Sequence, residues 1–262
     1  MPRLAANIAY MFTERPLLER IGAAARAGFK AIELQFPYEH EPASAMKAEI
    51  DKHALTVLGL NTARGGDQDF GYAAVPGRER EFAAQFRQAL DYIVAVGGRS
   101  VHCLAGKVPP NERPAAERAY VANLSAAADI AAAKNIFLLI EPINYFERPD
   151  YYLNYVEHAA DIIAKTGRAN IKIQFDFYHV QIMQGDLIRR FEKHQKLIGH
   201  VQVAAVPTRH EPDEGEINHP AIFTALDDFR YDGWVAGEYR PRGRTEDGLS
   251  WAAPYGVVPR TK

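Results

Sequence analysis

The most informative stretch of this sequence is His200-Val-Gln-Val-Ala-Ala-Val-Pro-Thr-Arg-His-Glu-Pro-Asp-Glu-Gly-Glu-Ile-Asn-His-Pro220. Its first half has the composition of a buried strand, because Val201 and Val203 favour extended structure and no acid or lysine interrupts them. His200 and Gln202 are two residues apart, so both side chains point to the same face of that strand. The run then breaks at a proline and continues as a loop rich in charged residues. This pattern is typical of a barrel strand whose end delivers polar groups to an active-site face.

The rest of the chain alternates short apolar runs with longer amphipathic segments. The apolar runs, bounded by turn residues, predict eight strands. They cover Arg3–Ala9, Lys30–Phe36, Leu55–Thr62, Arg99–Ala105, Asn135–Glu141, Asn170–Asp176, Leu197–Ala204 and Trp234–Tyr239. Apolar residues at helical spacing predict helices over Pro16–Ala27, Ala43–His53, Arg78–Val96, Pro114–Lys134, Leu153–Thr166, Val180–His194 and Pro220–Phe229, with a short last helix from Glu246 to Trp251.

Eight strands, each followed by a helix, predict an α/β fold of the (β/α)8 TIM-barrel type, which typically needs about 250 residues. The 262 residues therefore fit a single barrel domain spanning 1–262. A doubly wound parallel sheet is the alternative, but it usually carries a glycine-rich phosphate-binding turn after its first strand. The corresponding segment here, Ala9 to Glu14, contains no glycine, which favours the barrel.

The composition excludes several classes of partner. The net charge of -2 gives no electrostatic basis for binding nucleic acid or an anionic membrane. No apolar run approaches the length of a membrane span, and the N-terminal residues do not form a signal-peptide pattern. The single cysteine, Cys103, excludes an internal disulfide and a cysteine-rich metal site, and its place in a buried strand predicts an inert thiol. We therefore expect a protein of the reducing cytoplasm that acts on a small molecule.

Polar side chains stand at the carboxyl ends of four consecutive predicted strands, where a TIM barrel places its active site. They are Glu141, Asp176, Gln202 and Glu238. Three carboxylates and one amide oxygen form a hard, oxygen-only ligand set of the kind that Mg²⁺ or Mn²⁺ prefers. A single acid at such a position would more often cap a helix or pair with an arginine. Four such positions on successive strands favour one divalent cation.

Five further residues are candidates for contact with the substrate. His179 and Arg209 fall just past strand ends, where they would meet substrate oxygens held by the cation. His102, near the end of the fourth strand, is a similar candidate. Arg209, Arg240 and Arg64 are candidates to hold a carboxylate through the paired donors of a guanidinium, and the sequence does not choose among them. A lone histidine is more often structural and a lone arginine more often solvated, so the shared location at strand ends is what supports these roles.

Several motifs resemble those of the hydroxypyruvate isomerase family, which includes the 2-oxo-tetronate isomerases. The most specific is His200-Val-Gln-Val-Ala204, followed by Arg209-His-Glu-Pro212 and Gly215-Glu-Ile-Asn218. Other matches extend the resemblance over nearly the whole chain: Phe36-Pro-Tyr38, Asn61-Thr-Ala63, Pro76-Gly-Arg-Glu79, Glu238-Tyr-Arg-Pro-Arg-Gly243 and Thr245-Glu-Asp-Gly-Leu249. The family usually has an acid at position 205 and a glycine at 208, and often an arginine at 146, whereas this chain has Ala205, Thr208 and Phe146. These departures affect the part of the site expected to bind the distal end of the substrate. The resemblance therefore implies the family's reaction but not its substrate.

The resemblance implies a xylose isomerase-like barrel that holds one divalent ion with Glu141, Asp176, Gln202 and Glu238, and that contacts the substrate through His179 and Arg209. It implies isomerisation of a small 2-keto acid, either hydroxypyruvate to tartronate semialdehyde or 2-oxo-tetronate to 3-oxo-tetronate. Removal of a carbon-bound proton would give an enediolate, with Glu141 and Glu238 as the acid and base.

Three alternatives remain from the sequence. A ketose 3-epimerase acting on neutral sugars would use the same carboxylates, although such enzymes usually have histidine in place of Gln202. An endonuclease IV-like DNA repair enzyme would need a histidine-rich multi-zinc site and a basic face, and the sequence indicates neither. The third is a non-catalytic barrel that binds sugar acids. The sequence leaves open the substrate, the metal and the formation of a homo-oligomer.

Overall fold

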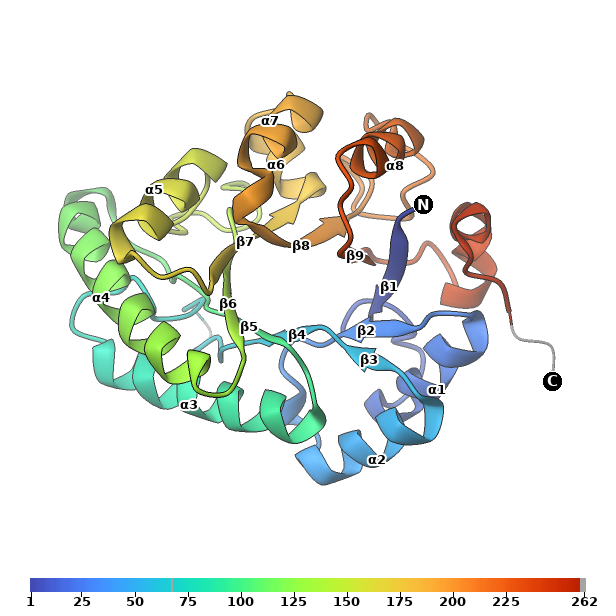
Figure 1. Cartoon of the computed structure of the whole chain (residues 1–262), viewed down its shortest axis with the longest axis horizontal. Helices are drawn as coiled ribbons and strands as arrows, with labels where there is room; N and C mark the ends of the chain where they lie inside the picture. The colour runs from blue at the N-terminus through green and yellow to red at the C-terminus, as the bar shows by residue number, and fades with distance from the viewer. Residues whose placement is uncertain (67, 260–262) are drawn as a thin grey trace.

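The computed structural model describes residues 1–66 and 68–259. Its parallel strands form a ring that is enclosed by helices (Figure 1). The strands are β1 (Arg3–Asn7), β2 (Ala31–Glu33), β3 (Thr56–Val57), β4 (Gly59–Asn61), β5 (Ser100–His102), β6 (Phe137–Ile140), β7 (Ile171–Asp176), β8 (Ile198–Val203) and β9 (Trp234–Gly237). Their order in the sheet is β3-β2-β1-β9-β8-β7-β6-β5-β4, and each neighbouring pair is parallel. The predicted TIM barrel is confirmed.

The third predicted strand, Leu55–Thr62, is divided into β3 and β4 at Leu58. β3 pairs with β2 and β4 pairs with β5, so this one predicted strand closes the ring between its two neighbours. A side-chain hydrogen bond lies at the division, where the hydroxyl of Ser100 donates to the carbonyl oxygen of Leu58 at 2.9 Å. A side chain at Gly59 would collide with that same hydroxyl, so the close approach requires glycine.

The helices cover the outside of the ring. They are α1 (Leu17–Ala27), α2 (Ala43–His53), α3 (Glu79–Val96), α4 (Arg113–Ala132), α5 (Val156–Thr166), α6 (Phe177–Met183), α7 (Leu187–His194) and α8 (His219–Asp228), with 3-10 helices η1 (Pro37–Glu39), η2 (Pro110–Glu112), η3 (Gln195–Leu197) and η4 (Thr245–Tyr255). The prediction of one helix over Val180–His194 is wrong. Gly185 and Asp186 both have positive φ, at 62° and 51°, and a right-handed helix cannot continue through that conformation. The predicted last helix is the 3-10 helix η4.

An aromatic cluster fastens α7 to the barrel. The ring of Phe191 lies 5.6 Å from Phe175 of β7 and 6.1 Å from Phe177 at the start of α6, measured between ring centroids. Phe229 and Tyr231, which follow α8, lie 6.1 Å and 5.7 Å from the same ring. Phe191 is 1% exposed, so nearly its whole ring is packed against other side chains of the core.

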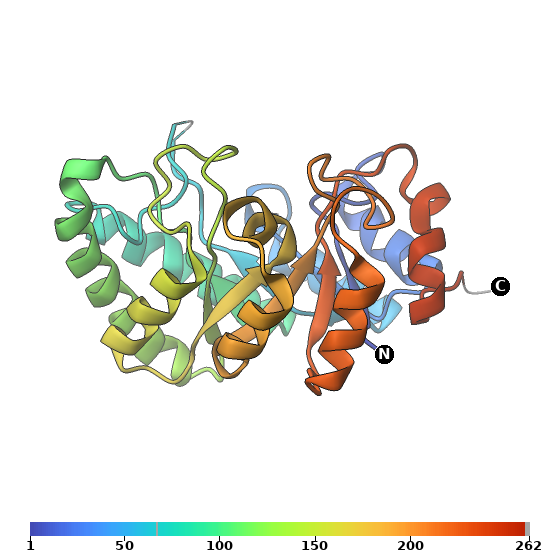
Figure 2. The same cartoon turned by 90° about the horizontal axis from the view of Figure 1, so that it is seen from above.

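The carboxyl ends of the strands all lie at one end of the barrel. Figure 2 shows the loop that follows β4, in cyan, and the loop that follows β6, in yellow-green, rising from that end. The C-terminal faces of TIM barrels carry their active sites on such loops. Among the described residues, every helix is too short or too polar to cross a membrane.

Candidate active site

The strand ends surround a cavity of about 90 Å³. Six of the candidates from the sequence line it: Glu141, Glu238, His102, His179, Arg64 and Arg209. Asp176 and Gln202, the other two predicted metal ligands, are fully buried next to these groups. Arg240 differs, because its side chain is exposed and does not line the cavity. The structure therefore does not bring Arg240 to the site.

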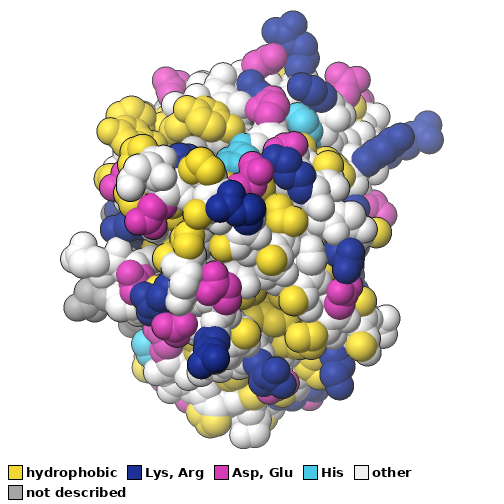
Figure 3. Space-filling model, turned by 90° about the vertical axis from the view of Figure 1, so that its left-hand side faces the viewer, with side chains coloured by type: hydrophobic (Ala, Val, Ile, Leu, Met, Phe, Trp, Pro, Cys, Tyr) yellow, Lys and Arg dark blue, Asp and Glu magenta, His cyan; other side chains and the backbone are white. Residues whose placement is uncertain are grey.

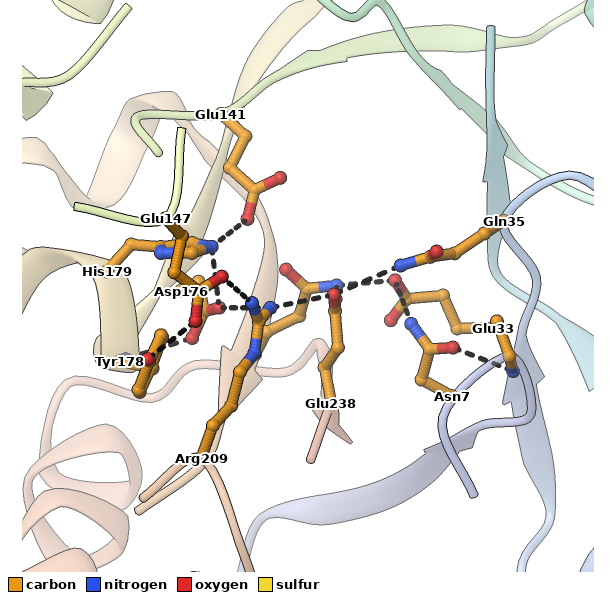
Figure 4. Close-up of polar contacts among 12 residues, drawn as sticks. Asn7, Glu33, Gln35, Glu141, Glu147, Asp176, Tyr178, His179, Arg209 and Glu238 are labelled. Atoms are coloured by element: carbon orange, nitrogen blue, oxygen red, sulfur yellow. Dashed lines mark hydrogen bonds and ion pairs between the residues drawn. The ribbon is translucent and has the colours of Figure 1, made fainter. Parts of the chain in front are cut away.

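Glu141 directly follows β6, Asp176 is the last residue of the neighbouring β7, and both side chains lie near His179 (Figure 4). The Nε2 atom of His179 lies 3.8 Å from Oε1 of Glu141 and 3.6 Å from Oδ2 of Asp176. One ligand atom from each of the three residues lies within 4.8 Å of the others. The spacing of the two carboxylates is therefore compatible with a single ion between them.

Three oxygen atoms of the predicted ligand set are buried without a hydrogen-bond donor among the described residues. They are Oε1 of Glu141, Oδ2 of Asp176 and Oε1 of Gln202. An unsatisfied buried acceptor costs about 1–3 kcal/mol, and a bound cation would remove that cost. The residues present, with Glu238 beside them, therefore fit a hard divalent cation.

The carboxyl groups of the site resist ionisation. Burial raises the pKa of Glu141 well above its ordinary range, and the charges of Glu238 and Asp176 raise it further. Burial also raises the pKa of Glu238, although Arg209 opposes the shift. The pKa of Asp176 is raised to about 7 by burial, again against Arg209. A cluster of this kind becomes fully ionised only when positive charge stands beside it.

Glu33 is a site residue that the sequence prediction missed. It is buried at the end of β2, where Nε2 of His200 lies 2.9 Å from its Oε2 atom and Asn7 donates to its Oε1 atom at 3.2 Å. The side-chain amide nitrogen of Gln202 donates to both Glu33 and Glu238, which leaves the amide oxygen of Gln202 for another partner. The available signal was an acid inside an apolar strand, since a buried carboxylate must find partners.

Arg209 is buried between carboxylates. Its Nη1 atom pairs with Glu147, and its Nη2 atom lies 3.1 Å from Oε1 of Glu238. The hydroxyl of Tyr178 donates to Glu147 at 2.7 Å and holds that carboxylate in place (Figure 4). Burial alone would lower the pKa of Arg209, but the charge of Glu238, with further groups around it, raises that pKa above its ordinary value. Glu147 was not predicted, because a loop position carries no periodic signal.

Asn144 sets the proton position on the ring of His179. Its Nδ2 atom lies 2.7 Å from Nδ1 of His179, while its Oδ1 atom accepts from the backbone N–H of Glu147 at 2.9 Å. Because the amide oxygen is occupied, the amide nitrogen donates to Nδ1, and the ring proton therefore lies on Nε2. Burial and the positive charges of Arg209 and Arg148 hold the pKa of His179 well below its usual range, so the ring is neutral. An N–H donor facing the cavity suits a substrate oxygen better than a cation.

His102 lies next to Glu141 in the cavity wall. Its Nδ1 atom is 3.5 Å from Oε2 of Glu141, and burial lowers the pKa of His102 to about 3. The structure therefore places a neutral histidine against one of the two predicted acid/base groups.

Two further arginines line the cavity, and each stacks on a phenylalanine ring. The Cζ atom of Arg64 lies 4.2 Å above Phe36, and its Nη2 atom pairs with Glu39 at 3.3 Å. The Cζ atom of Arg148 lies 4.5 Å from the ring centroid of Phe70, and its Nη1 atom donates to the carbonyl oxygen of the preceding residue at 2.9 Å. Arg148 was not among the sequence candidates, because it lies in the loop after β6 and not at a strand end.

Comparisons with known proteins agree with the barrel fold. A family model described as xylose isomerase-like TIM barrel matches residues 21–255. The chain is 43% identical over 258 residues to the 2-oxo-tetronate isomerase of Cupriavidus necator, which covers 97% of this chain and 99% of that protein. It is 37% identical over 259 residues to the hydroxypyruvate isomerase of Escherichia coli, covering 97% and 100% of the two chains. A crystal structure of an AP endonuclease, family 2, from Brucella melitensis is 43% identical and has a TM-score of 0.94 over 98% of this chain and 100% of that one.

Proposed function

We propose that this protein interconverts a small 2-keto acid and its aldehyde or 3-keto isomer through an enediolate. The proposal starts from its family, because the chain belongs to the xylose isomerase-like TIM barrel family and is an isomerase of the hydroxypyruvate isomerase kind. The proposed pairs are hydroxypyruvate with tartronate semialdehyde, and 2-oxo-tetronate with 3-oxo-tetronate. The observation that carries the proposal is that Glu141 and Glu238, both buried, line one cavity from the ends of β6 and β9 (Figure 4).

The proposed ligands of one Mg²⁺ or Mn²⁺ ion are Glu141, Asp176, Gln202 and Glu238. The buried oxygens of three of them that lack a donor among the described residues support this set. When bound, such a cation acts as a Lewis acid that polarises the substrate carbonyl.

Glu141 and Glu238 are the proposed proton carriers. One of them, when ionised, takes the proton from the hydroxyl-bearing carbon next to the carbonyl group, and the C–H electron pair forms the double bond of the enediolate as the carbonyl oxygen takes the charge. A proton then returns to the former carbonyl carbon, and the proton of the original hydroxyl group moves to the other oxygen, which leaves the new carbonyl group. A base works best when its pKa lies near the working pH. Burial raises the pKa of both groups from the ordinary carboxylate range, and a bound cation would lower it again. The Nε2–H group of His179 is the proposed donor to a substrate oxygen.

A turnover assay on metal-stripped protein tests the proposal. Mg²⁺ or Mn²⁺ is added back, and hydroxypyruvate, 2-oxo-tetronate and a ketohexose are offered in parallel. We expect cation-dependent conversion of a keto acid with the ketohexose as a poor substrate. Conversion of the ketohexose alone would establish the ketose 3-epimerase alternative. Binding of a keto acid with no turnover under any of these conditions would establish the non-catalytic barrel.

Glu141→Gln and Glu238→Gln variants test the residues. Each exchange keeps the side-chain shape but removes the ionisable group, so we expect turnover to fall by about 10³-fold or more in either variant. Full activity in both variants would sink the assignment of these two residues even if the wild-type assay succeeds.

The Brucella structure is named as an AP endonuclease, and this raises the DNA-repair alternative again. The net charge is -2, and on the face shown in Figure 3 basic and acidic side chains are interspersed. A nucleic-acid site normally gathers basic residues on one face. We expect no incision of a duplex oligonucleotide with one abasic site under the conditions that convert the keto acid, and incision would contradict the proposal.

A further inference from the structure

Arg148 combines three features that suit it to bind an anion. Its half-buried side chain lines the same cavity as Glu141 and His179. Stacking on Phe70 and the hydrogen bond to the carbonyl oxygen of Glu147 hold its guanidinium in place. Among residues 1–66 and 68–259, no carboxylate forms an ion pair with it.

The other two arginines that line the cavity already have acidic partners. Arg209 pairs with Glu147 and Glu238, and both of these carboxylates also line the cavity. Arg64 pairs with Glu39 and is half exposed. Each of the two would have to give up or share an existing ion pair in order to bind a substrate carboxylate.

Apart from the three arginines, the charged side chains that line the cavity are acidic. Glu141, Glu147 and Glu238 all contribute to its lining. An anionic substrate that enters such a cavity is repelled unless a cation faces its charged end, and the repulsion is strong where water is largely excluded. A positive side chain on the cavity wall that is not already paired would therefore favour binding of the carboxylate end of a keto acid, in addition to the groups that act on its carbonyl end.

We propose that Arg148 is the specificity-determining residue that binds the carboxylate of the substrate, an inference that rests on the proposed 2-keto acid function. The planar guanidinium supplies paired N–H donors that match the two oxygens of a carboxylate. Because Phe70 and the Glu147 carbonyl already fix its position, little conformational freedom is lost on binding. Arg209 then has a different role, which is to hold Glu147 and Glu238.

The test compares an acid with its neutral counterpart. Hydroxypyruvate and dihydroxyacetone have the same three-carbon skeleton, except that a hydroxymethyl group replaces the carboxylate. The KM for hydroxypyruvate and the inhibition constant of dihydroxyacetone as a competitor are measured for the wild type, Arg148→Gln and Arg148→Lys. In Arg148→Gln the positive charge is lost but a donor to the Glu147 carbonyl is kept. In Arg148→Lys the charge is kept but the fork of donors is lost.

We expect Arg148→Gln to raise the KM for hydroxypyruvate by about 10- to 100-fold, the usual effect of losing a charge-assisted hydrogen-bond pair. The inhibition constant of dihydroxyacetone should change by less than about threefold, and Arg148→Lys should lie between the wild type and Arg148→Gln. Equal effects on the acid and on its neutral counterpart would overturn the proposal. So would an Arg64→Gln variant that raises the KM more than Arg148→Gln does.

Arg113 provides a matched control outside the cavity. It is also half-buried, its Cζ atom lies 4.9 Å from the ring centroid of Tyr152, and its Nη2 atom donates to the backbone carbonyl of Tyr152. Arg113→Gln removes the same charge from the same kind of setting, and its KM should stay within about threefold of the wild-type value.

A direct binding measurement separates this inference from the proposed function. If the wild-type protein converts no keto acid, the proposed function fails, and calorimetric titration with hydroxypyruvate then tests Arg148 alone. Binding by the wild type and Arg113→Gln that is weakened at least tenfold in Arg148→Gln would support the carboxylate site. Equal binding by all three proteins, or none by the wild type, would overturn it.

Discussion

The Nη2 atom of Arg209 lies 3.1 Å from Oε1 of Glu238, so a guanidinium from the loop after β8 stabilises the ionised form of a carboxylate at the end of β9. The two groups are buried together, and the strength of their interaction reflects the low polarity around them. Because Glu238 is a proposed proton carrier, this ion pair links a loop residue to the pH at which the base becomes active.

Replacing Arg209 by methionine should move the pH dependence of catalysis. Burial raises the pKa of Glu238 and Arg209 opposes that shift, so removal of Arg209 raises the pKa further. The base then ionises at higher pH, and the acidic limb of the profile of kcat/KM against pH should move to higher pH. At pH 7 we expect a loss of about 100-fold in kcat. Arg209→Lys keeps the charge and should move the limb less, whereas an unmoved limb in Arg209→Met would contradict the prediction.

In the metal-stripped protein, the contribution of Asp176 to stability should fall as the pH rises. The folded-state pKa of Asp176 is raised from 3.8 to about 7, so the folded protein binds more protons than the unfolded chain between these values. The contribution of this group to the free energy of unfolding therefore falls as pH rises from about 4 to about 7. Thermal melts of the wild type and Asp176→Asn at a series of pH values check this, because other titrating groups act equally in both proteins. The Tm of the wild type minus that of the variant should fall across this window, and a constant or rising difference would refute the prediction.

Divalent cations should stabilise the same protein at neutral pH. A ligand that binds only the folded state contributes about 2.7 kcal/mol at 100 times its Kd, which corresponds to a rise of about 5 to 10 °C in Tm for a chain of this size. Glu141→Gln should reduce this rise in Tm, because it removes a proposed ligand carboxylate. One oxygen of that carboxylate has no hydrogen-bond donor among the described residues. A Tm that does not respond to Mg²⁺ or Mn²⁺ would argue against the proposed ligand set.

The ring proton of His179 can be located directly. The hydrogen bond from the Asn144 amide to Nδ1 predicts the Nε2–H form, which nitrogen-15 NMR distinguishes from the Nδ1–H form by the chemical shifts of the two ring nitrogens. Asn144→Asp replaces the donor by an acceptor and should favour the Nδ1–H form, with a loss of activity of about 10-fold or more. An Nδ1–H signal in the wild type would contradict the assignment.

Truncation of Phe191 tests the aromatic cluster behind β7. Phe191→Ala removes a ring that contacts four others and should lower the free energy of unfolding by about 3–5 kcal/mol, measured by urea denaturation. Phe146 offers the same exchange at an exposed position, with 73% of its surface accessible. Phe146→Ala should change the stability by less than about 0.5 kcal/mol. Equal effects of the two exchanges would show that the cluster does not stabilise the fold.

The barrel could be predicted from the sequence because its signals are local and repeated. Each strand is a short apolar run, and α1, α3 and α5 each end at a glycine in the left-handed conformation, the residue type that adopts it most readily: Gly28, Gly97 and Gly167. The two breaks were missed for different reasons. The contact at Leu58 involves Ser100, which is 42 residues away in the sequence. The helix break has a local signal in Gly185, although Asp186, which also has positive φ, gives none of its own.

For the candidate site, too, some residues could be predicted from the sequence and others could not. Glu141, Asp176, Gln202 and Glu238 could be selected because strand ends in a barrel must meet. Arg64 and Arg209 were equal candidates in the sequence, and only their partners, Glu39 for one and Glu147 with Glu238 for the other, distinguish them. The sequence does not show which arginine has an acidic partner, because the pairing depends on how distant segments meet in the folded protein.

The loop after β6 carries Glu147 and Arg148 side by side, one bound to Arg209 and the other proposed to bind the substrate. The proposed proton carriers stand at the ends of barrel strands, whereas the residue proposed to select by charge lies in this loop. On this proposal, substrate preference is a modular property of the protein. A change in the loop could redirect the enzyme toward a neutral or a differently charged sugar derivative during evolution, while the bond chemistry at the strand ends stays intact.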